Sequence, residues 1–139
     1  MIRKMTVNMM VADVQKTIAF YQSQLEFSFA MGVTAQGNEV LNANDPDREL
    51  VYAMMTSGDV EIMFQQTASL AADIPAFAGM SAGASVSFYC DTDDVEALYA
   101  KLRSTTTVVK ELHTTWYGMR EFYITDCNGY VLGFAQQQA

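Results

Sequence analysis

The fold is indicated by two segments that repeat one pattern: VADVQKTIAFYQSQL at residues 11–25 and CDTDDVEALYAKL at residues 90–102. Each begins at the end of a β-rich stretch and continues with an aspartate suited to cap a helix, Asp13 or Asp94. Apolar residues at helical spacing then follow. A shift of 81 residues places Asp13 on Asp94 and Val14 on Val95. Two copies of one supersecondary unit are the simplest explanation.

Each predicted helix is preceded by one β-type segment and followed by three. The first strands are predicted at 5–11 and 85–90, and the later ones at 27–35, 49–56, 60–66, 106–112, 119–125 and 130–136. The sequence therefore predicts an α+β protein of two βαβββ modules, 1–66 and 84–139. Residues 67–83 are predicted to be a linker, and residues 36–48 a long loop.

The amino-acid composition and net charge argue against some classes of binding partner for this protein. The formal net charge of −8 repels phosphate backbones and anionic lipid surfaces, so nucleic acid and membranes are not expected partners. The acidic excess serves either solubility or the attraction of a cationic ligand. Cys90 and Cys127 match no metal spacing, and no segment is typical of a signal peptide or a membrane span, so we expect a cytoplasmic protein.

The order of these segments resembles the vicinal-oxygen-chelate superfamily, which includes glyoxalase I, extradiol dioxygenases, fosfomycin-resistance enzymes and bleomycin-resistance proteins. The resemblance is carried by residues 11–14, 18–21, 25–27, 58–63, 93–99, 120–122 and 126–130. It implies that the modules form a curved mixed sheet with a concave cleft. One departure is Cys127, where many relatives have proline.

In metal-using members of that superfamily, four ligands, usually His or Glu, lie on the first and last strands of both modules. Those positions fall here on Thr6, Met63, Ser87 and Gly133, none of which suits a hard divalent ion. We therefore expect no metal and no cofactor. His113 is the only histidine and is predicted to lie in a loop, as either an ordinary surface residue or a group that contacts a ligand.

Alternation along the strands predicts which side chains face the cleft. The candidate ligand-binding residues are Asn8, Met10, Glu61, Met63, Ser87, Tyr89, Trp116, Glu121 and Tyr123. Two alternatives stay open: Glu61 and Glu121 as idle, solvent-facing carboxylates, and Trp116 as a packing residue rather than a stacking surface. No residue is predicted to be catalytic, because the sequence contains no recognisable catalytic constellation.

The leading hypothesis is a non-catalytic protein that binds or sequesters a small organic molecule, aromatic and cationic in the favoured version. The resemblance to bleomycin-resistance proteins implies a homodimer. A second hypothesis is a metal-independent, glyoxalase-like or dioxygenase-like lyase or isomerase that uses carboxylate or tyrosine acid–base chemistry. A third is a protein-interaction or regulatory module.

Overall fold

The chain folds into two units, residues 1–82 and 83–139, in this computed structural model, which describes residues 1–138. The first unit contains β1 (Val7–Val11), α1 (Val14–Leu25), β2 (Ser28–Thr34), β3 (Val40–Leu41), β4 (Leu50–Ser57), β5 (Val60–Gln66), α2 (Thr67–Asp73) and the 3-10 helix η1 (Pro75–Phe77). The second contains β6 (Ser87–Asp91), α3 (Val95–Leu102), β7 (Thr107–Thr114), β8 (Met119–Thr125) and β9 (Val131–Gln137).

Both units build their sheets in the same way. The five-stranded sheet has the order β1-β5-β4-β2-β3, with β1 parallel to β5 and the other pairs antiparallel. The four-stranded sheet has the order β6-β9-β8-β7, with β6 parallel to β9. The predicted α+β class and the two βαβββ modules are confirmed, and their strands form two mixed sheets.

The two repeated aspartates cap the helices in the same way. Asp13 Oδ1 accepts a hydrogen bond from the Lys16 backbone N–H at 3.0 Å, and Asp94 Oδ1 accepts one from the Ala97 N–H at 3.0 Å. Each side chain thereby satisfies an N–H group that lacks a partner within the helix. The identical caps explain why the sequence pattern repeats at this point.

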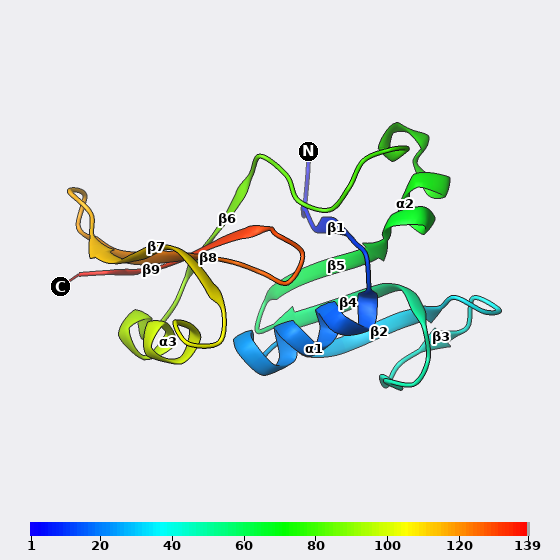
Figure 1. The fold of residues 1–139 in the computed structure, drawn as a ribbon, viewed down its shortest axis with the longest axis horizontal. Coiled ribbons are helices and arrows are strands. Elements are labelled where there is room, and N and C mark those ends of the chain that lie inside the picture. The colour runs from blue at the N-terminus through cyan, green and yellow to red at the C-terminus, as the bar shows by residue number, and fades with distance from the viewer. Residues whose placement is uncertain (139) are drawn as a thin grey trace. The chain divides into compact units, whose positions relative to one another are not determined.

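Helices α1 and α3 each cover one face of their own sheet (Figure 1). In the first unit, the Tyr21 ring of α1 packs against Phe64 of β5 with 4.9 Å between ring centroids. In the second, Tyr99 of α3 packs against Phe122 of β8 at 5.0 Å. Phe64 and Phe122 are fully buried, and burying side chains of this size stabilises a unit by about 1.5–3 kcal/mol each. The apolar cores therefore lie on the helix side.

Several local expectations are corrected by the structure. The segment 36–48 is not wholly a loop, because β3 pairs with β2 inside it. The Gln15 amide also holds this segment against α1, donating to Asn44 Oδ1 at 3.0 Å and to the Arg48 carbonyl at 2.8 Å. His113 lies in β7 rather than in a loop.

Three further residues differ from the sequence-based expectation because they lie at or beyond the ends of strands. Thr6 precedes β1, so it is not a strand residue. Val60 and Val86, which alternation assigns to the helix side, are 54% and 53% exposed. Val60 opens β5 directly after a turn and Val86 precedes β6, so neither lies over its helix.

Among residues 1–138, no helix is long and apolar enough to cross a lipid bilayer. Within residues 1–138, neither Cys90 nor Cys127 forms a disulfide bond. Burial, and to a lesser degree the charge of Asp91, raise the pKa of the Cys90 thiol, which therefore stays protonated at neutral pH.

Candidate functional site

Strand pairing gathers polar and aromatic side chains on the sheet of the second unit. Tyr89 of β6 and Tyr123 of β8 both lie opposite Gly133 of the central strand β9. His113 of β7 lies opposite Glu121 of β8. Side chains directly opposite each other in neighbouring strands are in contact range. Because Gly133 has no side chain, the space above β9 is left to the residues on either side.

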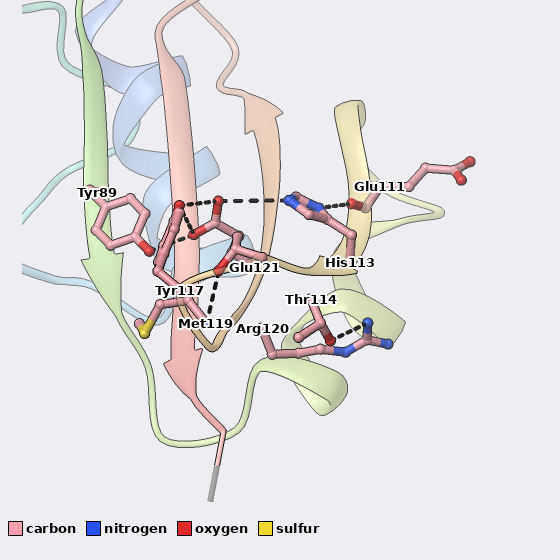
Figure 2. Close-up of polar contacts among 9 residues, drawn as sticks. Tyr89, Glu111, His113, Thr114, Tyr117, Met119, Arg120 and Glu121 are labelled. Carbon is pink, nitrogen blue, oxygen red and sulfur yellow. Dashed lines mark hydrogen bonds and ion pairs between the residues drawn. The ribbon is translucent and has the colours of Figure 1, made fainter.

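Glu121 is the centre of this arrangement, and its carboxylate is buried, with the residue only 2% exposed. The Tyr89 hydroxyl donates to Glu121 Oε2 at 2.5 Å, and the Tyr117 hydroxyl lies 3.1 Å from Oε1 and 3.3 Å from Oε2 (Figure 2). Tyr117 comes from the turn between β7 and β8, where Gly118 adopts φ +84°. We call Glu121, Tyr89, Tyr117 and His113 the Glu121 cluster.

His113 approaches the same carboxylate from the other side (Figure 2). Its Nδ1 lies 2.8 Å from the Glu111 carbonyl oxygen, which can only accept, so Nδ1 carries a proton. In the neutral ring, Nε2 then has a lone pair and faces Glu121 Oε1 at 3.7 Å. In the protonated ring, Nε2 carries a hydrogen and forms an ion pair with Glu121. Either way, His113 is the nearest cationic or basic partner that the structure gives Glu121.

The buried carboxylate keeps the surrounding phenols neutral. Its hydrogen bond, followed by burial and by the negative charge of Glu121, raises the pKa of Tyr89 well above the usual value of 10.0. The pKa of Tyr123 is also raised, mainly by burial and then by the charge of Glu121. Both phenols are therefore protonated near neutral pH, and Tyr89 serves as a hydrogen-bond donor to Glu121 rather than as a base.

The candidate residues of the first unit form a different surface. Asn8 lies opposite Met63, which lies opposite Met54, so an amide and two thioethers share one row across β1, β5 and β4. The Asn8 amide donates to Gln65 Oε1 at 2.9 Å. Its own Oδ1 is buried and accepts no hydrogen bond from the described residues. This row suits apolar, adaptable contact.

Two candidate residues of the first unit present less charge or less surface to a ligand than the sequence predicted. Glu61 forms an ion pair with Lys4, and its side chain is 28% exposed, so its charge is locally compensated. Met10 is 5% exposed and presents almost no surface to a ligand. Glu61 and Glu121 therefore differ in kind, because the first is paired with a cation near the surface and the second is buried.

The two remaining candidates lie at the edges of the second unit. Ser87 is exposed and pairs with Val131, one row away from Tyr89 and Gly133. Trp116 is 95% exposed, so it is not a packing residue. Its ring stands nearly perpendicular to that of Tyr117, with 5.2 Å between centroids. Trp116 is thus joined to the Glu121 cluster through Tyr117.

The sequence reasoning missed Tyr117 as a member of the site, and it left His113 open between an ordinary surface residue and a group that contacts a ligand. The signal for His113 is the hairpin register, since Thr114 pairs with Arg120 and His113 with Glu121. Extending the predicted strand 106–112 by two residues would have placed His113 opposite Glu121. The sequence gives no comparable signal for Tyr117, because its contact depends on how the turn folds back over the sheet.

Two shallow hollows occur elsewhere, in the first unit. One, of about 250 Å³, is lined by Thr34, Gln36 and residues 47–49. The other, of about 200 Å³, is lined by residues 12–15, 49–50 and 66. Neither contains a candidate residue, and the first is lined by polar side chains alone, so the Glu121 cluster remains the stronger site.

The four positions at which the superfamily resemblance places metal ligands do not fit a metal. Thr6 and Ser87 offer neutral hydroxyls, and Met63 offers a thioether, which is a poor ligand for hard divalent ions. Gly133 offers no side chain. A Cβ atom at Gly133 would lie 2.4 Å from the Tyr123 ring, so that ring occupies the space of any side chain there.

The family follows from comparison with known proteins. The sequence profile of the Glyoxalase/Bleomycin resistance protein/Dioxygenase superfamily matches residues 5–134. The chain therefore belongs to this superfamily. A search of curated protein sequences finds no match.

Solved structures show the same fold at low sequence identity. TioX from Micromonospora sp. ML1 is 15% identical with a TM-score of 0.70, and the alignment covers 96% of this chain and 97% of TioX. A glyoxalase/bleomycin resistance protein/dioxygenase from Nocardioides is 13% identical with a TM-score of 0.71, covering 99% and 86%. A virulence protein from Salmonella typhimurium is 20% identical with a TM-score of 0.66, covering 99% and 98%.

The donor set at Thr6, Met63, Ser87 and Gly133 predicts that the purified protein carries no stoichiometric divalent metal. Elemental analysis after extensive dialysis tests this directly. Thermal unfolding with and without added Ni, Zn, Mn or Fe provides a second readout, in which no stabilisation is expected. About one tightly held ion per chain would contradict the prediction.

The Tyr89–Glu121 hydrogen bond predicts that Tyr89 resists ionisation. Tyrosinate absorbance during an alkaline titration should show that Tyr89 ionises at higher pH than ordinary tyrosines, by difference from Tyr89→Phe. Glu121→Gln should lower the Tyr89 pKa, since it removes the charge that opposes ionisation. The stabilisation by the protonated phenol is complete below about pH 10 and is lost as pH rises through the raised folded-state pKa. An unchanged titration in Glu121→Gln would contradict the assignment.

Proposed function

We propose that this protein binds a small organic molecule that carries a protonated nitrogen beside an aromatic or apolar group, and that it does so without catalysis. The binding surface is the Glu121 cluster together with Tyr123 and Trp116. Sequestration of a small organic molecule is also the activity that resemblance to bleomycin-resistance proteins implies.

The observation that carries the proposal is the buried carboxylate of Glu121 behind exposed phenols. Tyr89 and Tyr117 donate to it through neutral hydroxyl groups, which orient toward the charge without cancelling it. Tyr89 and Tyr117 are 49% and 52% exposed, so about half of each residue is open to solvent beside that charge. Aromatic groups backed by a carboxylate attract organic cations.

The net charge of −8 adds to this preference, since it favours the approach of cations and disfavours anions. The exposed Trp116 ring supplies a flat apolar surface next to Tyr117. A ligand with a cationic nitrogen and an adjacent ring would therefore use both the electrostatic and the stacking parts of the surface.

A metal-independent lyase or isomerase is the second candidate function. One observation favours it: Tyr89 is hydrogen-bonded to Glu121, and His113 Nε2 lies 3.7 Å from the same carboxylate, so three groups that can exchange protons lie close together. The raised pKa of Tyr89 weighs against it, because this phenol does not ionise near neutral pH to serve as a base. Turnover of a bound carbonyl compound would favour the enzyme, and binding without turnover the proposal above.

Glu121→Gln tests the binding proposal, with 2-phenylethylammonium as the cationic probe and 2-phenylethanol as its neutral analogue. Trp116 fluorescence reports binding, because no other tryptophan contributes. Loss of the carboxylate charge beneath the phenols should weaken binding of the ammonium probe by about tenfold and leave binding of the alcohol nearly unaffected.

Glu96→Gln is the matched control. It removes the same charge from the same unit, but Glu96 lies on α3 and bonds to Arg120 at the surface. Its effect on either probe should be small. Equal losses for both probes in Glu121→Gln, or no preference of the wild type for the ammonium, would contradict the proposal. Glu61→Gln should weaken the ammonium less than Glu121→Gln does, because Lys4 already compensates Glu61.

We further propose that the protein works in the cytoplasm as a homodimer. The edge strands β1 and β6 each have one hydrogen-bonded neighbour within the described residues, so each leaves an edge able to pair or to be covered. Sedimentation at micromolar concentration should give a particle of about twice the chain mass of 15.4 kDa. A single monomeric species would contradict the dimer.

A further inference from the structure

We propose that the Glu121 cluster selects ligands by hydrogen-bond polarity, accepting a primary or secondary ammonium and discriminating against a quaternary ammonium of similar shape. This inference rests on the proposed function and specifies the chemical class of its ligand. It depends on where the hydroxyl protons of Tyr89 and Tyr117 point.

A tyrosine hydroxyl has one proton and two acceptor lone pairs. Glu121, as a carboxylate, can only accept, so the hydroxyls of Tyr89 and Tyr117 direct their protons inward to it. The lone pairs of both oxygen atoms are then the groups left for an outside partner. An exposed tyrosine elsewhere can turn its proton to suit either kind of partner, but these two cannot do so without losing a charge-assisted bond.

In its neutral form, His113 also presents a hydrogen-bond acceptor, as the two phenol oxygen atoms do. Its Nδ1 proton is committed to the Glu111 carbonyl, so the ring turns an acceptor nitrogen toward the cluster. Three groups from β6, β7 and the β7–β8 turn thus present acceptors around one buried negative charge (Figure 2). A ligand nitrogen that bears hydrogens can satisfy such acceptors, whereas a methylated quaternary nitrogen has no hydrogen to donate.

The geometry also distinguishes this site from an aromatic cage. Aromatic cages bind quaternary ammonium ions by surrounding them with ring faces. Here the hydroxyl ends of Tyr89 and Tyr117 converge on Glu121, which already fills the centre, and the carboxylate is only 2% exposed. The carboxylate therefore polarises the phenols rather than contacting the ligand, and the phenol oxygens are the atoms that bind.

Tyr89 and Tyr117 are thus specificity-determining residues, and removal of their oxygen atoms provides the test. The probes are 2-phenylethylammonium and its N,N,N-trimethyl derivative, titrated into the whole protein with Trp116 fluorescence as readout. The wild type should bind the ammonium about tenfold more tightly than the quaternary probe. Tyr89→Phe and Tyr117→Phe should each reduce this ratio, because each variant weakens binding of the ammonium probe and leaves binding of the quaternary probe unchanged.

Tyr99→Phe is the matched control, since Tyr99 packs on Phe122 on the helix side of the same sheet. It should leave the ratio between the two probes unchanged. Urea unfolding of each variant identifies any loss of the folded state, and because Tyr89 and Tyr117 are about half exposed, both variants should fold.

The outcomes separate this inference from the function on which it rests. A quaternary probe that binds as tightly as the ammonium, while both bind better than 2-phenylethanol, overturns the polarity inference and leaves the cation-binding proposal standing. Two cations that bind no better than 2-phenylethanol overturn both. A tenfold preference that survives both tyrosine variants overturns the assignment of selectivity to Tyr89 and Tyr117.

Discussion

The hydrogen bonds from Tyr89 and Tyr117 to the buried carboxylate of Glu121 are the interaction on which the account of this site depends. Burying a carboxylate is unfavourable unless hydrogen bonds replace its contacts with water. The two hydroxyls supply those bonds and leave the negative charge in place. The same contacts join β6, β8 and the β7–β8 turn, so the polarity of the surface and the position of the turn depend on one residue.

The duplicated module explains how one chain carries two different surfaces. Asn8 in β1 and Tyr89 in β6 occupy equivalent positions of the repeat, and each lies opposite the equivalent residue of its last strand, Met63 or Gly133. In the first unit, this pair is an amide and a thioether. In the second, it is a phenol and a glycine, and the missing side chain leaves room for the Tyr123 ring. The same backbone register thus supports apolar contact in one unit and a charged, aromatic cluster in the other.

The sequence predicted the features that depend on local pattern. The caps at Asp13 and Asp94, the helices after them and the alternation along β8 that separates Glu121 and Tyr123 from Phe122 follow from spacing alone. Contacts that depend on tertiary structure could not be predicted from the sequence in the same way.

The burial of Glu121, for example, requires Tyr117 to fold back from a turn, and no periodicity encodes that contact. Met10 is another case, because alternation assigned it to an open face and the structure buries it. The short strand β3 was also missed, since two residues within a polar loop form no detectable pattern.

The most direct test of the central claim is to observe the hydroxyl protons of Tyr89 and Tyr117 by NMR spectroscopy, with Phe variants for assignment. The account predicts two hydroxyl resonances shifted downfield and protected from exchange with water, each with cross-relaxation to the Glu121 side chain. Hydroxyl protons that exchange as fast as that of free tyrosine in water, or that show no contact with Glu121, would contradict it.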